Sequence, residues 1–168
     1  LKQFNDRWFL LCTPVEDEIY PYNPEFIATF ALDRIDSKFE YAEEIPYIET
    51  PVDLKARFDE VVGVTILKDK ETEYIYFAVH PQSLPYIQTK YIHWSQMQLD
   101  EEFEAEFKNR YPRLKDWTFF TIECRPNNEL YGRFASYSDK IVLVEPKEMR
   151  DEMAKSLATA AENYRALP

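Results

Sequence analysis

Continuous apolar runs in this chain predict short buried strands, because a strand needs only about four to eight such residues whereas a helix shows a longer period. The runs are Arg7–Cys12, Phe26–Leu32, Val61–Leu67, Tyr74–Val79, Trp117–Cys124 and Ile141–Val144. A weaker alternation of Trp94, Met97 and Leu99 hints at one more strand. The predicted strands form one group near the start of the chain and a second group after residue 60.

Apolar residues at spacings of three and four predict helices between these strands. Asp100 and Asn127 are expected to cap two of the helices, and Pro146 is expected to open the last one. The residues at helical spacing are Leu84, Ile87 and Tyr91; Phe103, Phe107 and Tyr111; Leu130, Phe134 and Tyr137; and Met149, Met153, Leu157, Ala160 and Tyr164. A short helix is also expected around Asp53–Phe58.

An acidic stretch with two prolines, Phe39–Asp59, separates two predicted domains, residues 1–60 and 61–168. Thr13–Asn23 is predicted to be a surface loop within the first domain. The second domain alternates strands and helices as a split βαβ unit, with an insertion before its third strand. We therefore predict an α+β protein whose second domain has a ferredoxin-like βαββαβ fold.

The composition predicts a folded chain without a membrane span. Apolar residues make up 45% and aromatic residues 16% of the 168 positions, which excludes disorder. No apolar run reaches the roughly 18 residues of a membrane span, and no signal peptide is evident. Because the chain begins with Leu1, we expect it to be a fragment, with the first strands of its first domain and any targeting or DNA-binding segment lying upstream.

The net charge of −11 opposes general binding to nucleic acid. The first fifty residues contain four basic and eleven acidic side chains. A local pocket around Arg7 and Arg34 would still attract an anion.

The reactive residue types give no catalytic or metal-binding pattern. Cys12 and Cys124 each lie in an apolar run, which favours two reduced thiols in a cytoplasmic protein. The spacing of His80 and His93 relative to them does not suit zinc, and no metal or cofactor is expected. Only two glycines occur, too few for a phosphate-binding loop. A Cys124–His93 nucleophile and base pair is the one enzymatic alternative, and we expect no enzyme.

Two strings near the start resemble the paired signature of the WYL domain, a sensor module of bacterial transcription regulators. They are Trp8-Phe9-Leu10 and Leu32-Asp33-Arg34-Ile35. The second half resembles the C-terminal extension that commonly follows a WYL domain. Its strings are His93-Trp94-Ser95-Gln96, Asn127–Leu130, Ser136–Asp139, Val142–Pro146 and Met149-Arg150. The resemblance covers most of the chain in the expected order.

The resemblance implies a partial Sm-like, SH3-type β-barrel behind a winged helix-turn-helix domain, so that DNA would be bound only through that missing domain. It also implies an effector, either a nucleotide or single-stranded nucleic acid. The implied ligand-binding residues are Arg7, Trp8, Phe9 and Arg34, with Asp33 supporting Arg34. A base stacked on Trp8 or Phe9 would contribute about 1–3 kcal/mol, and the arginines would bind phosphate oxygens.

Several residues depart from the family pattern and keep a second hypothesis open. Phe9 replaces the tyrosine, and Ala31 stands where many members have an arginine. The alternative is a protein-interaction and dimerisation module that has lost effector binding. A core position for Trp8 and a purely structural role for Arg34 remain open as well. Under either hypothesis we expect a cytoplasmic homodimer.

Overall fold

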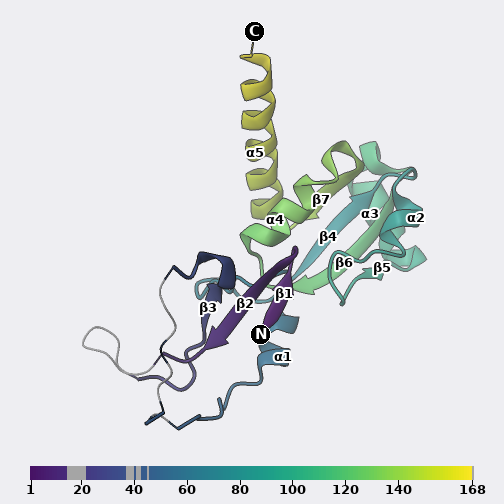
Figure 1. The fold of residues 1–168 in the computed structure, drawn as a ribbon. Helices are drawn as coiled ribbons and strands as arrows, with labels where there is room; N and C mark the ends of the chain where they lie inside the picture. The colour runs from purple at the N-terminus through teal and green to yellow at the C-terminus, as the bar shows by residue number, and fades with distance from the viewer. Residues whose placement is uncertain (15–21, 37–39, 41–42, 45, 168) are drawn as a thin grey trace. The chain divides into compact units, whose positions relative to one another are not determined.

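The structure is a computed structural model that describes residues 1–14, 22–36, 40, 43–44 and 46–167. The chain divides into two compact units, Leu1–Phe58 (unit 1) and Asp59–Pro168 (unit 2), close to the predicted domain boundary (Figure 1). The predicted loop at 13–23 and the connector at 39–59 lie partly outside the described residues. Among the described residues, no helix has the length and apolarity needed to cross a membrane.

Unit 1 contains an antiparallel sheet of three strands in the order β1-β2-β3. Its elements are β1 (Lys2–Phe4), β2 (Arg7–Cys12), β3 (Ala28–Ala31), the 3-10 turn η1 (Leu32–Arg34) and α1 (Leu54–Asp59). Asn5 and Asp6 join β1 to β2 with positive φ values of 47° and 60°, as a tight hairpin turn requires. The predicted strand at Phe26–Leu32 is too long, because the chain turns at Leu32 into η1.

Unit 2 contains an antiparallel sheet of four strands in the order β5-β6-β4-β7, which confirms the predicted mixture of helices and sheets. The strands are β4 (Glu73–Val79), β5 (Met97–Gln98), β6 (Thr118–Cys124) and β7 (Ile141–Glu145). The helices are α2 (Leu84–Ile87), α3 (Glu101–Arg110), α4 (Asn128–Ala135) and α5 (Lys147–Arg165), with 3-10 turns η2 (Pro112–Leu114) and η3 (Ser138–Lys140). The predicted strand at 61–67 is wrong, because this buried stretch has no strand conformation.

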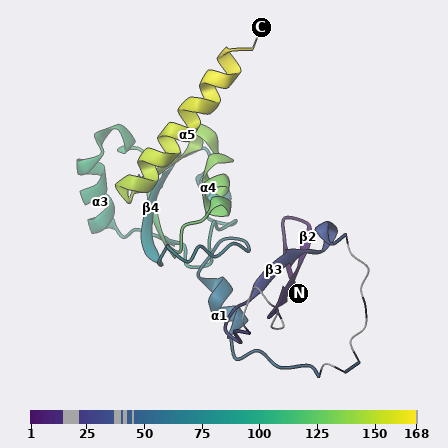
Figure 2. The same cartoon turned by 90° about the vertical axis from the view of Figure 1, so that its left-hand side faces the viewer.

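Aromatic side chains fill the space on both faces of the unit 2 sheet. On one face Phe77 stacks on Phe120 at 5.6 Å and meets Phe134 of α4 edge-on at 5.3 Å. On the other face Phe107 of α3 packs 5.5 Å from Phe119. Figure 2 shows α3 and α4 on opposite sides of β4. The predicted insertion therefore supplies a third layer to this unit.

Both predicted N-caps are confirmed. The Asp100 carboxylate accepts hydrogen bonds from the backbone N–H groups of Glu102 and Phe103. The Asn127 side chain accepts one from Leu130 N–H at 2.8 Å. These bonds satisfy donors that have no partner within the helix, which fixes where α3 and α4 begin.

The last helix buries much less of its apolar stripe than the sequence predicts. Met149 and Met153 are buried, whereas Leu157 is 40% and Tyr164 79% exposed. Figure 1 shows why, since α5 continues well beyond the sheet of unit 2. Its second half has an apolar face that no described residue of unit 2 covers.

Candidate functional site

The predicted ligand-binding residues lie on both faces of the unit 1 sheet. Side chains alternate along β2, so Arg7 and Phe9 lie on one face and Trp8 on the other. The register pairs Phe9 with Ala31, which places these two residues on the same face. The structure therefore brings Arg7 and Phe9 together but separates them from Trp8.

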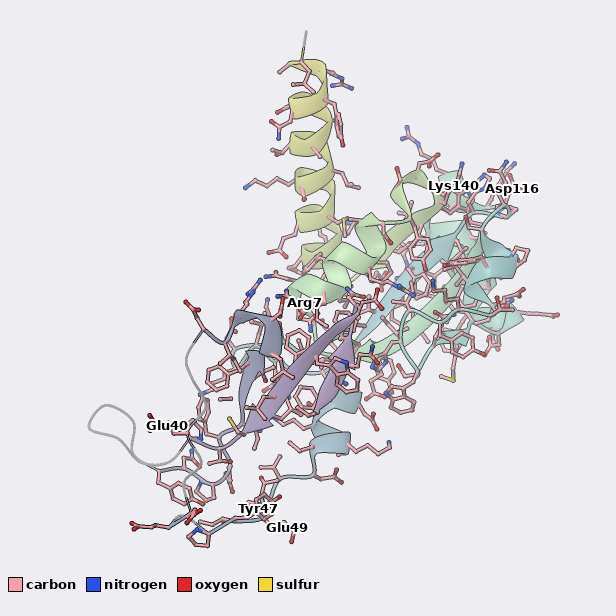
Figure 3. The ribbon with its side chains drawn as sticks, viewed as in Figure 1. Arg7, Glu40, Tyr47, Glu49, Asp116 and Lys140 are labelled. Carbon is pink, nitrogen blue, oxygen red and sulfur yellow. The ribbon has the colours of Figure 1, made fainter. Side chains whose placement is uncertain are left out.

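The guanidinium of Arg7, which is labelled in Figure 3 and begins β2, pairs with the Asp33 carboxylate of η1 at 2.6 Å. Hydrogen bonding to Arg7, together with its positive charge, holds the pKa of Asp33 below its ordinary value. Among the described residues, no hydrogen bond or ion pair joins Asp33 to Arg34. Asp33 thus orients Arg7 rather than Arg34, and the Arg34 side chain is left exposed.

The opposite face of this sheet carries two exposed aromatic rings. Trp8 is 49% and Phe30 48% exposed, so Trp8 is not buried among the described residues. The register pairs Leu10 with Phe30, and Leu10 lies two residues from Trp8, which puts all three on one face. The sequence analysis missed Phe30, because only the pairing of β2 with β3 places it beside Leu10.

Further polar residues stabilise the buried segment at the start of unit 2. His93 Nε2–H donates to the Asp59 carbonyl oxygen at 2.8 Å, and His93 Nδ1 is 2.7 Å from Ser95 Oγ. Burial lowers the pKa of His93, so the ring is neutral at pH 7. Trp94 Nε1–H donates to the same carbonyl at 2.7 Å. This string is engaged in structural hydrogen bonds.

Asn127 connects a helix start to that same segment. Its Nδ2 donates to the carbonyl oxygens of Val62 at 2.9 Å and Thr65 at 2.8 Å, while its Oδ1 caps α4. The side chain is 1% exposed, so these carbonyls have an internal partner in place of water. The described residues contain no group of His, Cys, Asp and Glu side chains able to hold a metal ion.

A comparison with protein families matches residues 74–161 to the WCX domain. The chain belongs to the WCX domain family. This domain is the C-terminal extension associated with WYL domains, and the match is consistent with a fragment of a WYL-type regulator. The strings at 93–96, 127–130, 136–139 and 142–146 all lie within the WCX domain. A comparison with curated proteins gives no match.

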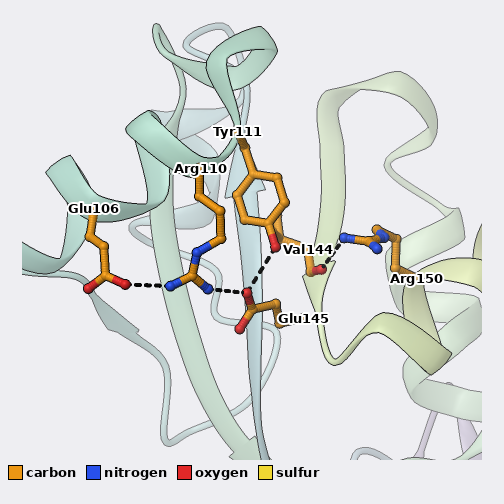
Figure 4. Close-up of polar contacts among 6 residues, drawn as sticks. All are labelled: Glu106, Arg110, Tyr111, Val144, Glu145 and Arg150. Carbon is orange, nitrogen blue, oxygen red and sulfur yellow. Dashed lines mark hydrogen bonds and ion pairs between the residues drawn. The ribbon is translucent and has the colours of Figure 1, made fainter.

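The polar network in Figure 4 joins α3 to β7 within the WCX domain. Glu145 accepts hydrogen bonds from Arg110 at 2.6 Å and from the Tyr111 hydroxyl at 2.9 Å. Arg110 also pairs with Glu106, one helical turn earlier. At the start of α5, Arg150 donates to the Val144 carbonyl at 3.2 Å. The contacts of Arg110 and Tyr111 attach the C-terminal end of α3 to β7.

Cys124, the buried cysteine of the WCX domain, is shielded from solvent. Burial raises the pKa of Cys124 to about 11, so the side chain is a neutral thiol. Both ring nitrogens of His93 already have other partners. Neither residue is set up as a nucleophile or base in this arrangement.

Proposed function

We propose that this chain is the ligand-sensing and dimerisation region of a cytoplasmic WYL-type transcription regulator, acting on an upstream DNA-binding domain. The observation that carries the proposal is the WCX domain match at residues 74–161, preceded by WYL-like strings on β2 and at η1. Binding of an effector to unit 1 would shift the DNA-binding domain between two states. Such coupling is worth about 1–3 kcal/mol in most proteins.

The proposed folds are a partial Sm-like barrel for unit 1 and a ferredoxin-like fold for unit 2. The assignment of unit 2 is supported by the order β4, α2, β5, α3, β6, α4, β7, in which α3 is the insertion, and by a fully antiparallel sheet of order β5-β6-β4-β7. In this arrangement β6 lies between β4 and β5, as a split βαβ unit requires. The three-stranded meander β1-β2-β3 supports the assignment of unit 1 as a partial Sm-like barrel.

The proposed effector is a nucleotide or a single strand of nucleic acid. Trp8 and Phe30 present exposed rings on one face, and aromatic rings stack on bases without sequence preference. Arg34 supplies an exposed cation for a phosphate. The acidic surroundings weaken attraction over longer distances, so stacking contributes most of the binding energy.

The experiment is a titration of the protein into a fluorescein-labelled oligothymidine and a labelled nucleotide, with anisotropy measured at two salt concentrations. Trp8→Ala is expected to weaken binding about tenfold, the loss of one stacked base, and Arg34→Ala to reduce the salt dependence. Trp94→Ala and Arg113→Ala are the matched controls, since both residues are exposed and lie in unit 2. Equal losses in variants and controls, or no binding at all, would contradict the effector proposal.

The proposed homodimer uses the exposed half of α5. Leu157, Ala160 and Tyr164 continue the stripe of Met149 and Met153 along a face without charged residues. Two such faces would bury each other as in an antiparallel helix pair. In light scattering, Leu157→Glu is expected to convert a dimer to a monomer, while Thr159→Glu on the opposite side keeps the dimer. A monomeric wild-type protein would refute this part.

A second function, an interaction module without an effector, is favoured by one specific observation. Arg7, one of the two predicted phosphate partners, is already neutralised by Asp33 at 2.6 Å. Ala31 also occupies the position where many WYL domains have an arginine. A stable dimer that binds none of the labelled probes would support this alternative.

A further inference from the structure

One face of the unit 2 sheet is only partly covered by α3. The register aligns side chains in rows across the strands, and residues in one row share a face. The first row pairs Phe119 with Ala78; the second joins Met97, Thr121 and Tyr76; the third pairs Glu123 with Tyr74.

Helix α3 covers the first row and reaches only the edge of the second. Phe107 packs 5.5 Å from Phe119 and 5.0 Å from Tyr76. Beyond this point the side chains are open, with Tyr74 56% and Met97 62% exposed. Within the described part of unit 2, the ring contacts of α3 stop at Tyr76 and do not reach the third row.

The border of this open area is the helix edge that carries Phe103 and Glu106. Glu104, on the covered side of α3, accepts a hydrogen bond from Phe119 N–H at 3.1 Å. Arg110 binds Glu145 at 2.6 Å (Figure 4), and Glu145 is the register partner of Tyr76 in the second row. Phe103 and Glu106 lie on the Arg110 side of the helix by its periodicity. Phe103 is 56% exposed. We call the surface formed by Tyr74, Tyr76, Met97, Phe103, Thr121 and Glu123 the open shelf.

The open shelf contains a polar group that the rest of the described protein leaves unsatisfied. Thr121 is only 8% exposed, and its Oγ1 has no hydrogen-bond partner among the described residues. It points to the same face as its row partners Met97 and Tyr76. Since Oγ1 is itself buried, a docked segment would bind through the exposed side chains around Thr121.

The charges around the open shelf indicate which kind of partner it would bind. Glu123 lies in the third row, and Glu106 and Glu145 border the second row with Arg110 between them. Carboxylates beside exposed aromatic and Met side chains attract cations next to apolar groups. A second copy of the open shelf would set the same carboxylates against one another. We propose that the open shelf docks a basic, apolar-anchored segment of a partner protein.

The first test uses a fluorescein-labelled peptide of alternating lysine and leucine, with a glutamate and leucine peptide as its acidic counterpart. The full chain is titrated into each peptide and anisotropy is recorded. The lysine peptide is expected to bind saturably and the glutamate peptide not to bind. Equal binding of both peptides, or no binding of the lysine peptide, would overturn the proposal.

Variants then locate the binding site on the shelf. Tyr74→Ala is expected to weaken binding of the lysine peptide about tenfold and Glu123→Gln about threefold. Both side chains are exposed, so neither change threatens the fold. Tyr86→Ala on α2 and Glu148→Gln on α5 remove the same groups from exposed sites outside the shelf and are expected to leave binding unchanged. Losses of the same size in these controls would show general attraction to an acidic protein and refute the shelf as the site.

Discussion

The two sheets of this protein differ in how completely they bury their apolar residues. In unit 2, Ile75, Phe77, Ala78 and Val79 of β4 are fully buried between helices on both faces. In unit 1, the sheet contributes Ala31 to the buried set, while aromatic side chains on the same strands stay half exposed. The contrast indicates that unit 2 has its own core, whereas the described part of unit 1 leaves Trp8 and Phe30 half exposed.

The strongest way to test this contrast is to remove one aromatic ring from each sheet. Phe77→Ala is expected to lower the free energy of unfolding by about 3–5 kcal/mol, because Phe77 is fully buried against Phe120 and Phe134. Phe30→Ala should cost about 1 kcal/mol or less, since its ring is half exposed. Urea unfolding measures both. Equal losses would show that the two sheets depend equally on their aromatic residues.

Asn127 tests whether the start of unit 2 depends on one side chain. Asn127→Ala removes the cap of α4 and leaves the carbonyl oxygens of Val62 and Thr65 without that partner. We expect a loss of about 2–4 kcal/mol in the same urea experiment. Asn128→Ala is the control, because the neighbouring Asn128 is exposed. A loss below about 1 kcal/mol for Asn127→Ala would mean that water replaces the amide.

The elements that the sequence predicted well have strong local determinants. The dense apolar runs at β4, β6 and β7 and the caps Asp100 and Asn127 all correspond to observed elements. The prediction failed at 61–67, where Gly63 has a φ of 86° and the Asn127 side chain binds carbonyl oxygens that a neighbouring strand would otherwise bind. A contact of this kind spans more than sixty residues, so no local pattern reveals it.

The candidate site was only partly predictable for a similar reason. The alternation along β2 already separates Trp8 from Arg7 and Phe9. The pairing of Phe30 with Leu10, and of Arg7 with Asp33, depends on the register of β2 and β3 and on the turn η1. The unexpected exposure of Leu157 and Tyr164 depends on where the sheet ends, which the helical period of α5 does not encode.

The reactivity of the two cysteines measures how burial differs between the two units. Cys124 is fully buried in unit 2, whereas Cys12 at the end of β2 is only partly buried. At pH 8 iodoacetamide is therefore expected to modify Cys12 in the native protein and Cys124 only in urea, as mass spectrometry of peptides would show. Faster modification of Cys124 would contradict its burial.

The Cys124 thiol also predicts that the free energy of unfolding depends on pH. Burial raises the pKa of Cys124 from 9.0 to about 11, so the unfolded chain loses this proton first as the pH rises. The thiol's contribution is fully present below pH 9 and is lost as the pH rises through 11. Cys124→Ala should remove this part of the alkaline slope, whereas Cys12→Ala should change it less. Identical slopes in both variants would contradict the assignment.

The smallest expected effect on stability belongs to the ion pair of unit 1. Asp33 is exposed and Arg7 is partly exposed, so Asp33→Asn should leave the urea midpoint unchanged within error. Since Arg7 holds the pKa of Asp33 below its ordinary value, any contribution is present above about pH 4 and is lost as the pH falls.

Asp33→Asn does change the local charge, because the guanidinium of Arg7 loses its carboxylate partner and its positive charge is then free to attract an anion. If unit 1 binds an anionic effector on this side of the sheet, the labelled oligothymidine should bind Asp33→Asn severalfold more tightly, with a steeper salt dependence. Asp36→Asn makes the same change in net charge at an exposed neighbouring position and should have a smaller effect. Equal gains in both variants would reflect net charge alone and leave Arg7 without a part in binding. No gain in either variant would leave the Arg7 face without a part in binding and restrict the effector to the opposite face, which carries Trp8 and Phe30.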